Sequence, residues 1–179
     1  MGNAERAGRS LYIFDLDGTL AEKWKATILW GVVECLNRVE GEIAVATNQA
    51  GVGWHAVEGE PYPRPDEVGR RLVEVADAVP RLKRALWLVA IGDDRVSLPP
   101  GRWRVLADAV TRAAAPLDVR TSGDPAWRKP RPGMLLEACR AFDVSREKTV
   151  FIGDREEDAQ AAEAADVGFV RADQFFGRV

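Results

Sequence analysis

The stretch Leu11-Tyr12-Ile13-Phe14-Asp15-Leu16-Asp17-Gly18-Thr19 joins a short apolar run to an acidic turn. Short apolar runs that end in polar or glycine residues are typical of buried strands. Two further runs, 43–46 and 149–152, are followed by Thr47 and by Gly153-Asp154. In an open parallel sheet the ligand crevice lies beyond the carboxyl ends of the strands. The three runs therefore predict a parallel sheet with a polar site at one edge.

Helix and strand patterns alternate along the rest of the chain. Helical spacing of apolar residues predicts helices at 23–39, 66–79, 103–115, 134–142 and 155–165. Further strands are expected at 85–91, 117–120 and 167–170, and the Gly- and Pro-rich stretch 51–65 is expected to be a long loop near the site. This alternation indicates an α/β fold, a doubly wound, Rossmann-like parallel sheet of about five strands.

Four carboxylates lie close to these strand ends, Asp15 with Asp17 and Asp154 with Asp158. Gathering them without a counter-ion would carry a large repulsive and desolvation cost. Magnesium suits such a site, because it takes carboxylates together with phosphate oxygens and the sequence holds no His or Cys cluster. We therefore expect Mg2+ as the cofactor, with these four residues as candidate ligands.

The same segments allow phosphoryl transfer. Asp15 is the candidate nucleophile, which would form an aspartyl-phosphate, and Asp17 would protonate the leaving oxygen and later activate water. Thr47 and Lys129 would hold the oxygens of the transferring group. Asn48 either binds the same phosphate or only ties the loop. Each motif alone also fits a turn, a helix cap or a solvated charge, and their conjunction favours a catalytic site.

The motifs Asp15–Leu20, Thr47–Gly51, Lys129–Met134 and Gly153–Asp158 together resemble the four signatures of haloacid-dehalogenase (HAD) superfamily phosphatases. The Thr-Asn-Gln and Lys-Pro-x-Pro-Gly-Met patterns are similar to its subgroup III, which holds polynucleotide 3′-phosphatases, histidinol-phosphatases and heptose bisphosphate phosphatases. This resemblance covers nearly the whole chain, from Leu11 to Phe176.

The resemblance implies a role for each matched residue. Asp15 is implied as nucleophile, Asp17 as acid/base, and Thr47 and Lys129 as phosphate ligands. Magnesium is implied on Asp15, Asp154 and the Asp17 backbone carbonyl, with Asp158 acting through water or from outside the ligand shell. The second Asp of the first motif, Asp17, favours phosphoryl transfer over dehalogenation.

The composition fits a compact enzyme. The chain has 179 residues, of which 46% are hydrophobic. This length is sufficient for one well-buried core but short for two. We expect a flexible N-terminal segment at 1–10 and a single domain at 11–179. The net charge of −3 argues against generic polyanion binding. No run approaches a membrane span and no apolar signal core begins the chain, so we expect a cytoplasmic protein without membrane contact.

Cysteine and histidine content bears on metal binding. Cys35 and Cys139 lie in apolar helical patterns and are expected to be reduced core residues. The single His55 cannot complete the zinc-binding Cys/His cluster of heptose bisphosphate phosphatases, which ranks that relative lower.

The cover over the site is expected to be minimal or absent. Only the 27 residues 20–46 separate Thr19 from Thr47, too few for a lid domain beside a helix and a strand. An open site admits a large substrate, or a small one enclosed by a neighbouring subunit. The sequence leaves the oligomeric state open.

Three functions therefore remain open. Trp54, Trp127 and Arg128 flank the motifs and could contact bases, although tryptophan more often fills a core. They favour a phosphatase of polynucleotide 3′-phosphate ends, with a DNA or RNA end as partner and a separate kinase partner, since the chain lacks a Gly-x-x-x-x-Gly-Lys-[Ser/Thr] loop. The alternative is a phosphatase of a small phosphorylated metabolite: a sugar phosphate, a nucleotide or histidinol phosphate. A phosphate-binding module without activity is the third.

Overall fold

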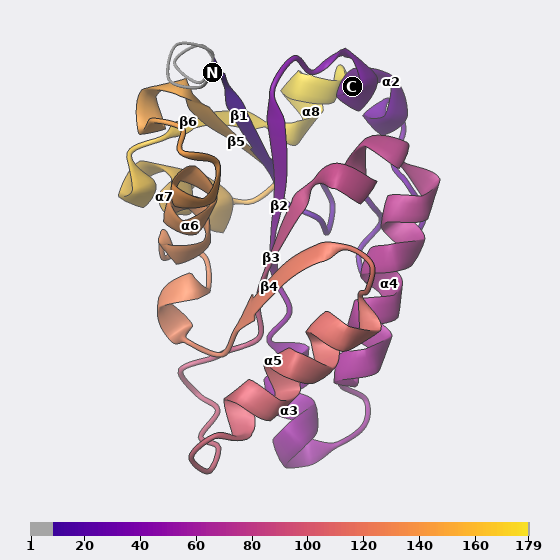
Figure 1. Ribbon diagram of the computed structural model, residues 1–179, viewed down its shortest axis with the longest axis vertical. Coiled ribbons are helices and arrows are strands. Elements are labelled where there is room, and N and C mark those ends of the chain that lie inside the picture. Colours follow the sequence, from indigo (N-terminus) through magenta and orange to yellow (C-terminus); the bar gives the residue numbers. More distant parts are fainter. Residues whose placement is uncertain (1–8, 179) are drawn as a thin grey trace, which may run out of the picture.

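The computed structural model describes residues 9–178, and a parallel sheet of six strands forms its centre (Figure 1). Neighbouring strands are parallel throughout the spatial order β4-β3-β2-β1-β5-β6. The strands are β1 (Leu11–Phe14), β2 (Glu42–Asn48), β3 (Leu86–Ala90), β4 (Asp118–Ser122), β5 (Thr149–Gly153) and β6 (Gly168–Arg171). The predicted doubly wound α/β fold is confirmed, and each of the six segments expected to be strands belongs to the sheet, which was expected to hold about five.

Helices cover both faces of the sheet (Figure 1). One face carries α2 (Val32–Arg38), α4 (Pro65–Ala78), α5 (Arg102–Ala113) and α8 (Ala172–Phe176), and the other carries α6 (Gly133–Phe142) and α7 (Glu156–Ala165). The remaining helix, α3 (Gly51–Glu58), follows the carboxyl end of β2. Short 3-10 helices lie at η1 (Pro80–Arg84), η2 (Pro125–Trp127) and η3 (Arg146–Lys148).

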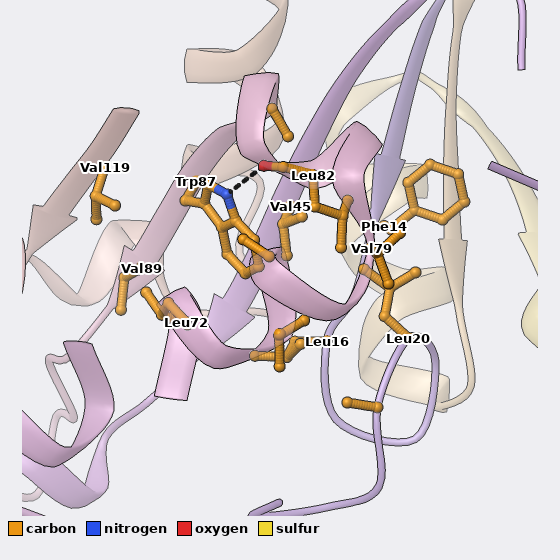
Figure 2. Close-up of a cluster of buried hydrophobic side chains, with 14 of the residues drawn as sticks. Phe14, Leu16, Leu20, Val45, Leu72, Val79, Leu82, Trp87, Val89 and Val119 are labelled. Atoms are coloured by element: carbon orange, nitrogen blue, oxygen red, sulfur yellow. Dashed lines mark hydrogen bonds between the residues drawn. The ribbon is translucent and has the colours of Figure 1, made fainter. Parts of the chain in front are cut away.

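Two apolar clusters form the core, one on each face of the sheet. Successive strand residues point to opposite faces, so Phe14 of β1 joins the cluster with α2, α4 and α5, whereas Leu11 and Ile13 join the one with α6 and α7. Figure 2 shows the first cluster, in which buried Trp87 donates its indole N–H to the Leu82 carbonyl at 3.1 Å. Burial on both faces explains why the strands read as apolar runs.

The predicted helix 23–39 is wrong in its first half, because α2 begins only at Val32. The residues before it fold back as a loop, in which Ala21 forms a bridge to Asp17. The Trp24 backbone lies in the left-handed region at φ 65°, and its N–H donates to the Asp17 carboxylate at 3.0 Å. A hydrogen bond to the acidic turn therefore replaces the local helix that the apolar spacing suggested.

The predicted loop 51–65 is wrong in part, because α3 occupies its first eight residues. Glycine is a weak helix former, but Gly53 lets α3 approach α5 closely. An added Cβ at Gly53 would lie 2.6 Å from the Trp103 ring. The other predicted helices and strands are confirmed to within two residues at each end, and α8 was not predicted.

Residues at the start of the described chain are paired with β2. Arg9 lies 2.8 Å from the Glu42 carboxylate, and the Ser10 carbonyl accepts a bond from the Glu42 N–H at 2.9 Å. The rest of the predicted flexible segment, residues 1–8, lies outside the described residues. Both cysteines are free, with Cys139 buried and Cys35 half-buried. Among residues 9–178, no helix combines the length and apolar character that a membrane crossing requires.

Candidate active site

Three carboxylates meet where the strand order reverses, at the carboxyl ends of β1 and β5. Asp15 directly follows β1, and its N–H bonds to the Ile152 carbonyl of β5 at 2.9 Å. Asp154 directly follows β5, and Asp158 lies in the first turn of α7. Oxygens of the three side chains all lie within 4.8 Å of one another. Such a set of hard oxygen donors could hold a divalent cation of the magnesium type.

Two glycines leave the space that brings these carboxylates together. Gly18 has a φ of 91°, and an added Cβ there would collide with the Asp154 carboxylate. At Gly153 an added Cβ would lie 2.6 Å from Asp158 Oδ2. The same Asp158 oxygen accepts a bond from the Arg155 N–H at 3.1 Å, which caps α7. Gly18 and Gly153 are therefore required by close approach at the site.

Lys129 supplies the buried positive charge between two of the carboxylates. Its Nζ lies 2.5 Å from Asp15 Oδ1 and 2.7 Å from Asp158 Oδ1, and its side chain is 1% exposed. Burial disfavours the ammonium form, but the two carboxylates outweigh burial and raise the pKa of Lys129. The cation is therefore held in place by the acidic cluster.

Burial, together with neighbouring charge, disfavours the ionised form of two carboxyl groups of this cluster, Asp15 and Asp154. Burial, with Asp158 and Asp154 adding to it and Lys129 opposing it, raises the pKa of Asp15 to about 7. Burial and the neighbouring Asp158 also raise the pKa of Asp154. Lys129 therefore does not fully offset the cost of burying these carboxylates beside one another, and a bound cation would reduce that cost.

Asn48, at the end of β2, fixes the backbone of Lys129. Its Nδ2 donates to the Lys129 carbonyl at 3.1 Å, and its Oδ1 accepts from the Lys129 N–H at 3.0 Å. The side chain also lines the cavity described below. Of the two roles that the sequence allowed for Asn48, these bonds correspond to tying the loop.

Asp17 lies in the same acidic turn as Asp15, but its carboxylate is held by Arg71 and Gln49. Arg71 of α4 donates to both of its oxygens, at 2.6 Å and 3.4 Å, and Gln49 Nε2 donates at 3.0 Å. Gln49 also donates to the buried Thr47 hydroxyl at 2.9 Å. The Asp17 side chain is not part of the three-carboxylate cluster. Sequence reasoning missed Arg71, because nothing local marks a contact across 54 positions.

A cavity of about 210 Å³, which we call the inner cavity, opens in front of these residues. Asp15, Asp17, Thr47 and Asn48 lie on its wall, and so do the following additional side chains: Lys23, Trp24, Arg128, Arg155 and Glu157. Three of the four sequence motifs therefore line one hollow that is large enough for a phosphate group, and Lys129 of the remaining motif contacts Asp15 on its wall. Lys23 and Arg155 were not identified from the sequence.

The three predicted substrate contacts have different surroundings. Arg128 lies on the wall of the inner cavity. Trp54 lines a larger neighbouring cavity of about 740 Å³, which we call the outer cavity. Trp127 is half-buried and packs against the apolar cluster of α6 and α7. Its position matches the core role that tryptophan has more often.

Comparisons with known proteins agree with this geometry. Residues 126–171 match the family model "HAD-hydrolase-like". The chain is 49% identical over 41 residues, 23% of its length, to the D-glycero-beta-D-manno-heptose-1,7-bisphosphate 7-phosphatase of Vibrio cholerae. It is also 49% identical over 41 residues to the D-glycero-alpha-D-manno-heptose-1,7-bisphosphate 7-phosphatase of Campylobacter jejuni. These matches cover only 22% and 24% of those relatives.

A solved structure extends the likeness to the fold. A Mesorhizobium loti protein described as a HAD-like phosphatase superposes with a TM-score of 0.63 at 19% identity, over 89% of this chain and 69% of that one. The chain thus resembles HAD-superfamily phosphatases, including the heptose bisphosphate phosphatases. These local matches count against the lower rank given to the heptose bisphosphate phosphatases, although they do not extend to a zinc-binding cluster in this chain.

Proposed function

We propose that this chain is a Mg2+-dependent phosphomonoester hydrolase that acts on a small phosphorylated metabolite through an aspartyl-phosphate. One observation carries the proposal: Asp15 and Asp17 share the wall of the inner cavity, while Lys129 and two further carboxylates surround Asp15. The curated relatives, by their names, act on a phosphorylated sugar, which supports a small substrate.

The residues allow two successive displacements. An Asp15 oxygen forms a bond to phosphorus while the bond to the ester oxygen breaks, and Asp17 gives that oxygen a proton as the alcohol leaves. Water then attacks the same phosphorus, passes a proton to Asp17 and releases inorganic phosphate and the Asp15 carboxylate. Arg71 and Gln49 hold Asp17 for both proton transfers.

Charge stabilisation comes from the groups around Asp15. Lys129 faces the nucleophile, and the Thr47 hydroxyl lies on the cavity wall where phosphoryl oxygens would bind. Asp15, Asp154 and Asp158 would hold Mg2+, which when bound neutralises charge on the transferring group. The Asp17 carboxylate, engaged by Arg71, is left out of this ligand set.

A second candidate substrate is a polynucleotide 3′-phosphate end. Three basic side chains, Lys23, Arg128 and Arg155, line the inner cavity and would suit flanking phosphates. In that case a separate kinase partner would complete end healing. The outer cavity carries as many acidic as basic residues, which favours the small metabolite.

Phosphate release from a panel of esters tests the proposal. We expect turnover to require Mg2+. Asp15→Asn and Asp17→Asn should each lower the turnover rate by about 10³-fold or more. Asp118→Asn, a change at an exposed residue of β4, should leave the turnover rate unchanged. Loss of all turnover in Asp15→Asn with the fold intact would also exclude a mere phosphate-binding module. A steep loss of affinity with added salt would favour the polynucleotide end.

Stereochemistry gives the decisive check on the route. Two displacements at phosphorus retain configuration in an isotopically chiral ester, whereas direct attack by water inverts it. Inversion would overturn the aspartyl-phosphate route.

A further inference from the structure

The outer cavity adjoins the inner cavity and is more than three times its size, about 740 Å³ against about 210 Å³. Trp24, Ala50, Gly51 and Arg128 line both. In an in-line displacement the leaving oxygen lies opposite the attacking carboxylate, so the rest of the substrate extends away from Asp15. The outer cavity is the space beside the site that can take this leaving group, an inference that rests on the proposed function.

Aromatic rings form one wall of the outer cavity. Trp54 of α3 and Tyr62 stack with ring centroids 6.0 Å apart and an angle of 27° between their planes. His55 Nδ1 lies 2.7 Å from the Tyr62 carbonyl, which ties the Tyr62 loop to α3. The planar guanidinium of Arg95 lies 5.4 Å from the Trp54 ring centroid. These contacts hold the aromatic wall in place before any ligand binds.

A further ring stands at the junction of the two cavities. The Trp24 side chain is 58% exposed, which is unusual for so large an apolar group. Its position is fixed by the backbone, whose N–H bonds to the Asp17 carboxylate at 3.0 Å. A flat ligand that leaves the inner cavity would cover Trp24 and reach Trp54.

Charges in the outer cavity are balanced and mostly paired. Four basic and four acidic residues line it. Arg71 is paired with Asp17, and Arg95 is paired with Asp93, which also lies 3.9 Å from Arg128. No excess of positive charge is left to bind a second phosphate or a polyanionic strand. This part of the site therefore suits an uncharged group.

We propose that the outer cavity binds an uncharged, planar aromatic ring carried by the leaving group of the phosphomonoester. A nucleobase and a simple aryl ring share this chemistry. A sugar or a glycerol ester lacks it, and a bisphosphate would bring a charge that the cavity does not match.

Steady-state kinetics of the full chain with Mg2+ would test this class. The substrates are adenosine 3′-monophosphate, adenosine 5′-monophosphate and phenyl phosphate, against ribose 5-phosphate and glycerol phosphate. We expect kcat/KM to be roughly tenfold or more higher for the ring esters, from the usual strength of ring stacking. A preference for the adenosine esters over phenyl phosphate would identify a nucleobase site, and the reverse an aryl site.

Variants locate the effect in the cavity. We expect Trp54→Ala to lower kcat/KM by about tenfold for the ring esters and to leave the ring-free esters almost unchanged, since Trp54 lines only the outer cavity. Trp30→Ala is the matched control, because Trp30 is 75% exposed and lines neither cavity. Circular dichroism confirms the fold of each variant.

Binding of adenosine and phenol, measured by calorimetry, separates this inference from the proposed function because it needs no turnover. Binding that weakens in Trp54→Ala but not in Trp30→Ala supports the aromatic site even if every ester proves inert. If the ring-free esters are hydrolysed as efficiently as the ring esters, or if neither adenosine nor phenol binds more weakly to Trp54→Ala, the aromatic site is wrong while the phosphatase activity can still stand.

Discussion

Lys129→Met removes the buried cation that lies between Asp15 and Asp158. The lysine side chain is 1% exposed, and its Nζ lies 2.5 Å and 2.7 Å from the two carboxylates. Removing one partner of a buried ion pair costs about 3–5 kcal/mol, because the remaining charge is left uncompensated. Methionine fills a similar volume, so little of the loss comes from packing. We expect the free energy of unfolding of the metal-free protein to fall by about 3 kcal/mol or more.

Mg2+ should restore part of this loss, since a divalent cation on the same carboxylates replaces the missing charge and stabilises the folded state by mass action. Urea unfolding with EDTA and with saturating Mg2+ measures both effects. Lys83→Met is the matched control, because Lys83 pairs with Asp77 on the surface, where both side chains are more than half exposed. Exposed pairs contribute about 0–1 kcal/mol. If Lys129→Met and Lys83→Met unfold at the same urea concentration in EDTA, or if Mg2+ widens the gap between them, the charge balance described for the site is wrong.

Three further changes test other parts of the structure. Arg71→Met should lower kcat by roughly 10²-fold with KM little changed, because Asp17 loses two hydrogen bonds that orient its carboxylate. An equal change in kcat and KM would contradict this. Asp93→Asn should cost about 1–2 kcal/mol at neutral pH. Its bonds to Arg95 hold the pKa of Asp93 well below its usual range. The ionised carboxylate therefore stabilises the fold above about pH 4, and this contribution is lost as pH falls further. If the free energy of unfolding of Asp93→Asn falls with decreasing pH as it does in the unchanged protein, this account is wrong. Trp87→Phe should cost about 1–3 kcal/mol, since it removes the indole hydrogen bond to the Leu82 carbonyl, which keeps only its bond from the Ala85 N–H, and leaves a small void. Urea unfolding measures this loss.

The site residues that follow strands could be predicted because the signal for each is local. An apolar run predicts β1, and the residue after it, Asp15, must therefore lie beyond the carboxyl ends of the strands. The same holds for Thr47 at the end of β2 and Asp154 after β5. Lys129 lies on no strand, and it was identified from its charge, its place in the turn before a helix and its match to a family motif.

Local spacing failed where a distant partner competes with it. Apolar periodicity indicated a helix through Trp24, but the Trp24 N–H bonds to Asp17 and the chain folds back instead. The glycines of α3 read as a loop, but the contact of Gly53 with Trp103 stabilises a helix there. Contacts of this kind outweigh local preferences, which differ by about 1 kcal/mol or less for each of these residues.

The sequence by itself determined the α/β alternation, the order of the strands' polar endings and the residue types that gather at the site, because these depend on neighbours within a few positions. Only the tertiary structure decided that Asn48 holds the backbone of Lys129 across 81 positions and that Arg71 holds Asp17 across 54. It also decided that Trp127 packs in the core while Trp24 and Trp54 line the two cavities. Such pairings depend on how helices pack against the sheet, and no residue carries that information in its own neighbourhood.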